Sequence, residues 1–363
     1  MNLGFALEYS LGHITHSDNL KRVLARVPEI TPSYVDIPYD GIDAPWAKLP
    51  GIRSNWSLRA SIAAYLGMRP RVAQLDGALF HTQVTSLFST GIMRRVPSVV
   101  SLDATPLQYD ALGAFYGHTP SSNARLEAIK KRMNQRAFAA SRHLVTWSEW
   151  AKQSLVQEYG VPENKITVIP PGIDPDAWDF PDRVRRNTGP LKLLFVGGDF
   201  PRKGGDVLLL ALEPLLKSGN VTMEVVTQSP GVAEGLPNVN VHRGLSPNSD
   251  GLRALFAAAD LFVFPTRGDC LPLAVMEALC AGLPVVTTDV GALSEAVTDG
   301  VTGLVVPVNS IDGLRAAVAG LVQNRDEIQR MSANARAVGR ERFNATINYE
   351  RLITVVAQGN SVS

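Results

Sequence analysis

The stretch that decides the fold runs from Thr266 to Thr288 and reads TRGDCLPLAVMEALCAGLPVVTT. It follows an apolar run, Leu261-Phe262-Val263-Phe264, that is typical of a buried β-strand. A polar loop comes next, and a helical pattern extends from about residue 272 to residue 281. A glycine and a proline end that helix before Val285-Val286 begins another strand. The order strand, loop, helix, strand predicts one unit of a parallel α/β sheet.

The loop between this strand and this helix is a candidate ligand site. The first backbone N–H groups of a helix have no partner inside the helix and carry the positive end of its dipole, so they bind phosphate. Pro272 suits the first turn, because the N–H that proline lacks would have no partner there. Asp269 precedes the helix and Glu277 lies one to two turns into it, so both carboxylates can reach a ligand over the helix N-terminus. Carboxylates beside a phosphate site can accept hydrogen bonds from sugar hydroxyls.

The composition is that of a soluble globular protein with more than one domain. The chain has 363 residues, of which 45% are hydrophobic and 19% are charged, and this length favours two domains. It contains no run of about 18 apolar residues that would span a membrane. The first residues, MNLGFALEYS, lack a basic region and are expected to form a β-strand, not a signal peptide. The expected compartment is therefore the cytoplasm.

Cysteines and metal-ligand patterns give little support to other chemistries. Cys270 and Cys280 are too few for a disulfide framework. Cys270 lies beside Asp269, where it is either a nucleophile or a small residue packed beneath the loop. No Cys/His cluster has the spacing of metal ligands, and we interpret Asp174-Pro175-Asp176 as a proline-rich turn. We therefore expect no metal and no cofactor, and no motif indicates nucleic-acid binding.

The net charge of +1 hides an asymmetry, because residues 1–170 carry +5 and the remainder carries −4. Basic residues crowd one helical segment and an earlier stretch; they are Arg125, Lys130, Lys131, Arg132 and Arg136, with Arg53, Arg59, Arg69 and Arg71 before them. Two interpretations stay open. In the first, these residues form solvated helix faces. In the second, they form a basic patch that holds the N-terminal half at the anionic inner face of a membrane or binds an anionic acceptor.

The N-terminal half alternates short apolar runs with helical patterns, which predicts a parallel sheet covered by helices. The expected strands are 3–7, 34–37, 72–75, 98–102, 144–146 and 166–169, and the expected helices are 18–27, 58–66, 123–140 and 149–159. Ligands bind at the carboxyl ends of such strands. Three polar stretches follow strand ends there, at 10–16, 80–83 and 101–106, and Ser17 or Asp18 is expected to cap the first helix.

The second half opens with a strand pattern at 191–196, and a loop follows that reads Gly-Gly-Asp-Phe-Pro-Arg-Lys-Gly-Gly from residue 197 to 205. Its backbone N–H groups and its two cations, Arg202 and Lys203, can hold a diphosphate. We expect Lys203 to face solvent, so that replacing it costs little folding stability. The loop is not the dinucleotide-binding G-x-G-x-x-G fingerprint, which occurs nowhere in the chain. Further strands are expected at 221–226, 239–241 and 303–307, and further helices at 206 onward, 249–259, 310 onward, 325–340 and 346–357.

These features resemble the retaining glycosyltransferases of the GT-B fold (glycosyltransferase family 4, glycosyl transferases group 1), whose mark is a Glu, seven residues and a second Glu. Asp269 stands where that family usually has its first Glu, and Glu277 matches the second. The order of segments from Val145 to Pro307 also runs as in that family. The resemblance implies an α/β fold of two doubly wound, Rossmann-like domains facing across a cleft.

The resemblance also implies a domain organisation. We expect an acceptor-binding domain at 1–170, a linker at 171–190 and a nucleotide-sugar-binding domain at 191–340. The C-terminal helix, at 341–363, is expected to cross back to the first domain.

By resemblance, the protein is a metal-independent hexosyltransferase that uses a nucleotide-diphosphate sugar, with UDP favoured and GDP next, and a carbohydrate or lipid-linked acceptor. Asp269 would face the hydroxyls of the donor sugar, and Glu277 would face the ribose. The implied catalytic residues are Lys203, Arg202, Asp269, Asp103 and His118. The implied donor-binding residues are Gly12, Gly197, Gly198, Arg243, Leu245, Cys270, Leu271, Pro272, Leu273 and Glu277.

The chain departs from the family pattern at three places. Leu102 stands where relatives often have a His, Gly198 replaces the usual Arg, and Asp269 is one methylene shorter than Glu. Asp103, His81 or His118 would supply the polar contacts that Leu102 cannot make, and Arg202 would replace the missing Arg. Two other interpretations stay open. One is a nucleotide-sugar epimerase or phosphorylase on the same plan, and the other is a non-catalytic nucleotide-sugar binder, which the three departures favour.

Overall fold

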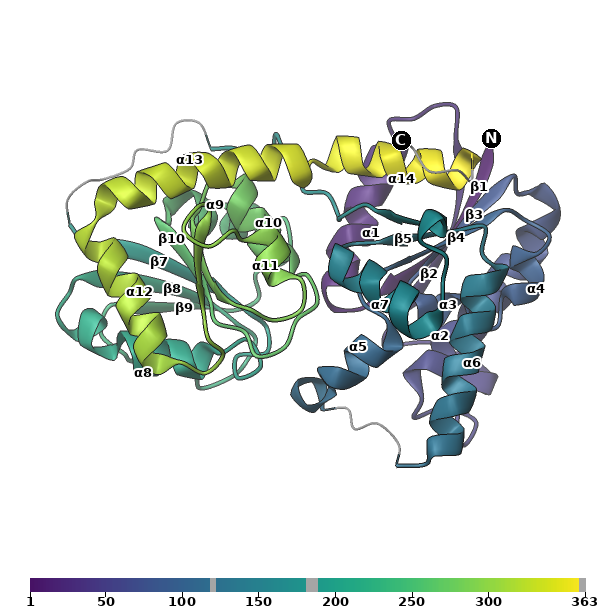
Figure 1. Ribbon diagram of the computed structural model, residues 1–363, viewed down its shortest axis with the longest axis horizontal. Helices are drawn as coiled ribbons and strands as arrows, with labels where there is room; N and C mark the ends of the chain where they lie inside the picture. Colours follow the sequence, from purple (N-terminus) through teal and green to yellow (C-terminus); the bar gives the residue numbers. More distant parts are fainter. Residues whose placement is uncertain (118–121, 181–188, 359–363) are drawn as a thin grey trace. The chain divides into compact units, whose positions relative to one another are not determined.

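The computed structural model describes residues 1–117, 122–180 and 189–358, and His118 lies outside these residues. The described chain forms two compact α/β units (Figure 1). Unit 1 contains the residues up to Ala114, those from 122 to Gly172, and those from Ala345 onward. Unit 2 contains residues 115–117 and the described part of Ile173–Asn344. Both units follow the predicted alternation of strands and helices, which confirms the α/β class.

The sheet of unit 1 has six parallel strands in the order β2-β1-β3-β4-β5-β6. They are β1 (Asn2–Tyr9), β2 (Thr31–Pro38), β3 (Gly77–His81), β4 (Ser98–Leu102), β5 (His143–Thr146) and β6 (Ile166–Val168). Its helices are α1 (Leu11–Leu24), α2 (Trp56–Met68), α3 (Gln83–Ser86), α4 (Thr90–Met93), α5 (Pro106–Ala111), α6 (Ala124–Ala140), α7 (Glu149–Tyr159) and α14 (Ala345–Gln358). Short 3-10 turns occur at Pro45–Lys48, Arg69–Gln74, Gly113–Tyr116 and Glu163–Lys165. The strand order reverses at β1, which has β2 on one side and β3 on the other.

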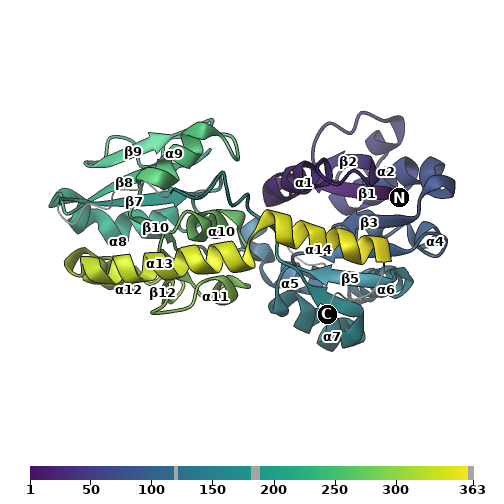
Figure 2. The same cartoon turned by 90° about the horizontal axis from the view of Figure 1, so that it is seen from above.

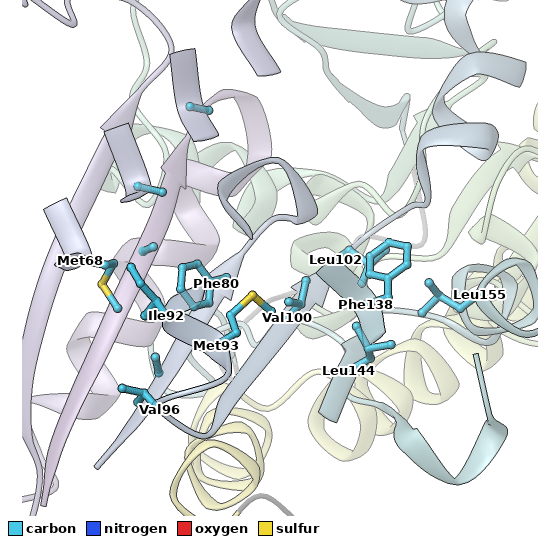
Figure 3. Packing of buried hydrophobic residues seen from close by; sticks show 14 of the residues in the cluster. Met68, Phe80, Ile92, Met93, Val96, Val100, Leu102, Phe138, Leu144 and Leu155 are labelled. Atoms are coloured by element: carbon cyan, nitrogen blue, oxygen red, sulfur yellow. The ribbon is translucent and has the colours of Figure 1, made fainter. Parts of the chain in front are cut away.

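Two apolar clusters cover the two faces of this sheet, because successive side chains of a strand point to opposite faces. Phe80, Val100 and Leu144 pack on one face with side chains from α6 and α7 (Figure 3). Leu102, the last residue of β4, belongs to the same cluster and is fully buried. The other face is covered by α1 and α14, which lie side by side (Figure 1).

The sheet of unit 2 also has six parallel strands, in the order β12-β11-β10-β7-β8-β9. They are β7 (Leu191–Val196), β8 (Val221–Val226), β9 (Val239–His242), β10 (Leu261–Phe264), β11 (Val285–Thr288) and β12 (Gly303–Val306). Its helices are α8 (Gly205–Lys217), α9 (Asp250–Ala258), α10 (Leu273–Cys280), α11 (Leu293–Ala296), α12 (Ile311–Gln323) and α13 (Arg325–Arg342). Helix α13 packs along α10 and α12 (Figure 2). The strand order reverses between β7 and β10.

Most expected elements are present within a few residues, and β4, β7, β8 and α7 have the predicted bounds. The predicted caps of α7 are confirmed as well. The Ser148 side chain accepts a hydrogen bond from the Ala151 N–H, and Gly160 ends the helix with a φ of +70°. No helix in the described part of the chain is long and apolar enough to cross a membrane.

Two predictions in unit 1 are wrong. Residues 72–74 belong to a 3-10 turn that ends before Leu75, and the strand is β3, whose five residues are all buried. Helix α1 begins at Leu11 with Ser10 at its N-cap position, so neither Ser17 nor Asp18 caps it. Polar residues early in α1 hid its start, because its first turn carries no periodic apolar pattern.

Candidate active site

The candidate site lies at the point where the strand order of unit 2 reverses. In open parallel sheets, ligands bind beside the carboxyl ends of the strands at such a point. The loop from Gly197 to Gly204 follows β7, and the loop from Pro265 to Pro272 follows β10. Because β7 and β10 are hydrogen-bonded neighbours, these two loops leave the sheet side by side.

Glycine is required where the two loops touch. Gly204 has a φ of +75°, and a Cβ atom at this position would lie 1.9 Å from the carbonyl oxygen of Pro265. The Arg267 N–H donates to the Arg202 carbonyl at 2.9 Å. The Arg267 guanidinium also forms a two-pronged ion pair with Asp206, at 2.6 and 2.8 Å, which ties the second loop to α8. The loops therefore form one fixed surface.

The Asp269 carboxylate is the centre of a charged cluster on this surface. Its Oδ1 atom accepts hydrogen bonds from Lys203 Nζ at 2.5 Å and from Arg202 Nη1 at 3.4 Å. Its Oδ2 atom accepts from the Thr266 hydroxyl at 2.7 Å. The Asp269 side chain is 8% exposed. The structure thus brings together Arg202, Lys203 and Asp269, and it adds Thr266, which sequence reasoning missed.

The expectation that Lys203 faces solvent is wrong, because its side chain is only 14% exposed. The ammonium group lies between Asp269 and the ring of Phe264, whose centroid is 5.1 Å from Nζ. Burial lowers the pKa of Lys203, and the charge of Asp269 opposes this effect. The sequence shows a lysine in a polar loop but does not show which carboxylate will cover it.

Arg202 is buried as well and connects both loops. Its side chain is 8% exposed, and it donates to the Gly268 carbonyl at 2.8 Å and to the Asp199 carboxylate at 3.2 Å. Gly197 is buried and packs against the stem of Lys203, whereas Gly198 is exposed and has open space around it. The Gly198 carbonyl accepts from Thr227 and Ser229 at 3.3 Å each, so the loop after β8 also supports the site.

Helix α10 begins at Leu273, four residues after Asp269, and supplies the predicted helix N-terminus. Pro272 is its N-cap residue and is half-buried, while Cys270, Leu271 and Leu273 are 5–7% exposed. Burial of the Cys270 thiol favours the packing interpretation over a nucleophilic one.

Glu277 lies on α10, and only 4% of the residue is exposed. Burial raises the pKa of its carboxyl group from 4.5 to about 8. Within the described residues, this carboxyl group forms no hydrogen bond and no ion pair. Burial therefore favours the protonated form of Glu277, which the sequence pattern did not indicate.

Two predicted donor-binding residues lie after β9, at the edge of the sheet. Arg243 pairs with Glu234 and donates to the Ser229 carbonyl at 3.0 Å. Leu245 is half-buried. Ser229 also accepts a hydrogen bond from the Phe200 N–H at 3.1 Å, so it connects this edge with the loop after β7.

The other predicted site residues belong to unit 1. Asp103 follows β4, and its side chain is 21% exposed. Gly12 is exposed and lies in the first turn of α1 instead of a loop. His81 ends β3 and is fully buried, with its Nε2 atom 3.0 Å from His13 Nδ1. His13 is a residue that the sequence analysis did not assign to a role.

No cluster of metal-ligating side chains occurs among residues 1–117, 122–180 and 189–358. The Asp174 carboxylate accepts hydrogen bonds from the N–H groups of Asp176 and Ala177, at 3.1 and 3.3 Å. The Asp-Pro-Asp triplet therefore forms a turn, as its proline content predicted.

Comparisons with known proteins agree with this fold. The sucrose-phosphate synthase of Thermosynechococcus elongatus superposes with a TM-score of 0.77 at 15% identity, covering 99% of this chain and 98% of that chain. Anabaena HepE in complex with UDP superposes with a TM-score of 0.72 at 16% identity, covering 99% of this chain and 100% of that chain. Two parallel α/β units with these neighbours define the GT-B fold, which confirms the predicted fold class.

Sequence comparisons identify the family. Residues 190–324 match the model described as Glycosyl transferases group 1, and residues 14–177 match the model described as Glycosyltransferase Family 4. The chain therefore carries domains of these two glycosyltransferase models, as its motifs predicted. A glycogen synthase of Mycobacterium tuberculosis is 31% identical over 223 residues, which make up 59% of this chain and 53% of that protein. The chain spans about half the length of the curated relatives that it matches.

Proposed function

We propose that the protein transfers a hexosyl group from a nucleotide-diphosphate sugar to a carbohydrate or lipid-linked acceptor, with retention of the anomeric configuration and without a metal. The observation that carries this proposal is the cluster of Arg202, Lys203 and Asp269 beside the N-terminus of α10. Two cations and a helix N-terminus on one rigid surface suit a diphosphate. UDP is the favoured nucleotide and GDP the next, and the complex of HepE with UDP supports this order.

In the proposed reaction, the bond between the anomeric carbon and the diphosphate oxygen breaks. The acceptor oxygen bonds to the same face of that carbon, and its proton passes to an oxygen of the leaving diphosphate. Lys203, Arg202 and the first N–H groups of α10 stabilise the charge that the diphosphate gains. Loss of one such donor typically costs about 3–4 kcal/mol of transition-state stabilisation, or roughly 10²–10³ in rate.

The diphosphate must compete with Asp269 for the Lys203 ammonium. Asp269 and Asp199 together balance the charges of Lys203 and Arg202, but Asp199 is 48% exposed and its charge is therefore screened. When the diphosphate takes Lys203, Asp269 keeps its bonds from Arg202 and Thr266. We propose that its carboxylate then accepts a hydroxyl of the donor sugar, and that Glu277 contacts the ribose.

Thermal unfolding with UDP, GDP, ADP and TDP tests the donor site. A ligand at about 100 times its dissociation constant adds roughly 2.7 kcal/mol of stability. We expect a shift with UDP that Lys203→Ala abolishes, while the control Lys192→Ala, an exposed lysine of β7, keeps it. No shift with any nucleotide would contradict the proposed donor site. In a separate assay, NMR of the product made from a UDP-sugar identifies its anomeric configuration.

The same assays separate the other candidate functions. An epimerase changes the donor sugar without any acceptor, and a phosphorylase needs phosphate, so product analysis with and without these compounds distinguishes them. A non-catalytic binder would bind the donor and release no product, even by hydrolysis. The buried Leu102 is the observation that favours this last candidate.

We also propose that α6 holds the protein at the inner face of an anionic membrane from the cytoplasm. Arg125, Ile129, Arg132 and Arg136 are exposed at helical spacing, so their side chains share one face. Basic and apolar residues on one face are typical of peripheral membrane contact. Flotation with anionic vesicles should recover the wild type but not a variant with all three arginines changed to Ala. A triple variant of the unit 2 arginines Arg253, Arg315 and Arg330 is the control, and equal recovery of both variants would contradict the proposal.

A further inference from the structure

Three histidines gather at the carboxyl ends of the unit 1 strands. His13 and His16 come from the first two turns of α1, and His81 ends β3. His13 Nδ1 lies 3.0 Å from His81 Nε2, and the rings of His16 and His81 are 4.3 Å apart. Trp147, which follows β5, stacks on His81 with ring centroids 5.6 Å apart and an angle of 14° between the planes.

Two of these histidines are enclosed and cannot touch a ligand. His16 is 2% exposed, its Nδ1 atom lies 3.1 Å from the Tyr349 hydroxyl of α14, and burial lowers its pKa to about 3. His81 is fully buried, and burial lowers its pKa well below the usual value. Both rings are therefore neutral at physiological pH. His13, whose side chain is 14% exposed, is the ring of the three that reaches the surface.

The neighbours of His13 determine where its proton lies. Asp103 uses Oδ1 to accept the Ala104 N–H at 2.9 Å, and its Oδ2 atom faces His13 Nε2 at 3.7 Å. A carboxylate in front of Nε2 favours a proton on that nitrogen. In that tautomer His13 Nδ1 can accept a hydrogen bond from Nε2 of a neutral His81. The resulting chain runs from His81 through His13 towards Asp103.

The pair of His13 and Asp103 suits a hydroxyl group. A separation of 3.7 Å is too long for a direct hydrogen bond and too short to hold an atom between the two groups, so a shared partner would lie beside the pair, within reach of both. His13 offers an N–H donor and Asp103 offers an acceptor. A hydroxyl both donates and accepts, whereas a phosphate oxygen would be repelled by the carboxylate.

The position of the pair in the fold also suits a ligand. The ends of β1, β3 and β4 lie where the strand order of the unit 1 sheet reverses, which is the usual ligand position in such sheets. The His that relatives often have at the position of Leu102 would lie at the end of β4, but the side chain of Leu102 packs in the apolar core. His13 and Asp103 are polar groups at this edge that remain partly exposed, at 14% and 21%.

We propose that His13 and Asp103 together bind a hydroxyl of the glycosyl donor or of the acceptor, with His81 and Trp147 holding the His13 ring. This inference rests on the proposed glycosyl transfer. His13 donates from Nε2 to the hydroxyl oxygen, and the hydroxyl donates to Asp103 Oδ2. No proton is transferred, and the pair acts by positioning the substrate.

The test compares His13→Ala, His13→Gln and the control His143→Gln. The Gln side chain keeps an N–H donor near the position of Nε2. His143 is a buried histidine of the same unit, but it begins β5 and so lies at the opposite end of the sheet. Each variant is assayed for hydrolysis of a UDP-sugar, for transfer to an acceptor and for stabilisation by UDP.

We expect His13→Ala to lower turnover about 10- to 100-fold, the effect of losing one hydrogen bond to substrate. His13→Gln should recover part of that loss, His143→Gln should match the wild type, and UDP should stabilise all of them equally. Loss of transfer and hydrolysis together assigns the hydroxyl to the donor sugar, and loss of transfer alone assigns it to the acceptor. Turnover of His13→Ala within about twofold of the wild type would overturn the inference.

A readout that needs no turnover separates this inference from the proposed function. If the wild type binds UDP but transfers no sugar, glycosyl transfer is refuted, and NMR of the histidine side chains decides the role of His13. Binding of the UDP-sugar should then shift the His13 signals, and UDP alone should not. Unchanged His13 signals with the UDP-sugar would overturn the hydroxyl site as well.

Discussion

Replacing Glu277 by Gln tests whether unit 2 encloses a protonated carboxyl group. Glu277 is 4% exposed, and burial raises its pKa from 4.5 to about 8. Gln has nearly the same shape and does not ionise, so it copies the protonated form of Glu. The variant should therefore fold as the wild type does, and the two proteins should differ in how their stability depends on pH.

The sign follows from the direction of the pKa change. Below pH 4.5 both the folded and the unfolded state hold the proton, and above about pH 8 neither does. Between these values the folded state keeps a proton that the unfolded state releases, so the free energy of unfolding falls as the pH rises. The slope is at most about 1.4 kcal/mol per pH unit, which over this window gives an upper limit of about 5 kcal/mol.

The assay measures the Tm of both proteins between pH 5 and pH 9 and subtracts one from the other, which removes the contribution of all other groups. Near pH 5 the two Tm values should be close. At pH 9 the Gln variant should be more stable, and each 1 kcal/mol of difference corresponds to about 2–4 °C for a unit of this size. Glu213→Gln is the control. The hydrogen bond from Lys217 lowers the pKa of the exposed Glu213 carboxyl group, so this substitution should change the pH dependence of stability only below pH 5. A constant difference between wild type and Glu277→Gln, within about 1 °C, would refute the buried protonated carboxyl.

Three further substitutions test the site and its support. Gly204→Ala should lower the free energy of unfolding by about 3 kcal/mol or more, because its Cβ would meet the Pro265 carbonyl. The control Gly219→Ala, with a similar φ of +74° and open space around it, should cost only about 1–2 kcal/mol, and equal losses in urea unfolding would contradict the loop contact. Lys203→Ala should cost about 1–3 kcal/mol, because Asp269 loses a buried partner, and an unchanged urea midpoint would show that the ion pair contributes nothing. Leu102→His should lower the free energy of unfolding by about 2–4 kcal/mol without raising turnover, because the imidazole enters the apolar core. A more active variant would show that position 102 can face the substrate.

The sequence predicted the strands of unit 2 well because each contains several apolar β-branched or aromatic residues and is bounded by turn residues. The run Leu191–Val196 and the run Val221–Val226 are strands with those bounds. Strand β3 was missed because the apolar residues at 72–75 drew the prediction to a segment that follows Arg69-Pro70-Arg71 and forms a tight turn, while the true strand contains Gly and His. Local pattern thus locates strands rich in apolar residues, but it did not locate β3, which begins with Gly and ends with His.

The site was predicted as two loops, but their internal contacts were not. Spacing along the chain places Lys203 and Asp269 after neighbouring strands, which only suggests that they are close. Their ion pair depends on the approach of Gly204 to Pro265, a backbone contact between residues 61 positions apart. The pair of His13 and His81 is separated by 68 positions and depends on the strand order β1-β3-β4. Neither contact can be derived without the sheet order.

The same strand order bears on the meaning of Leu102. Side chains alternate along β4, so its last residue falls on the face that packs against α6 and α7, and a polar side chain there would lose the core contacts that Leu102 makes. On one side of β4 lies β3, which ends with His81, and beyond β3 lies β1, which leads into α1 and its His13. An imidazole can therefore reach this edge of the sheet from a different loop without any change in β4. The departure at position 102 consequently gives less support to a non-catalytic binder than the motif alone suggests, because the polar group that this loop lacks is present one loop away.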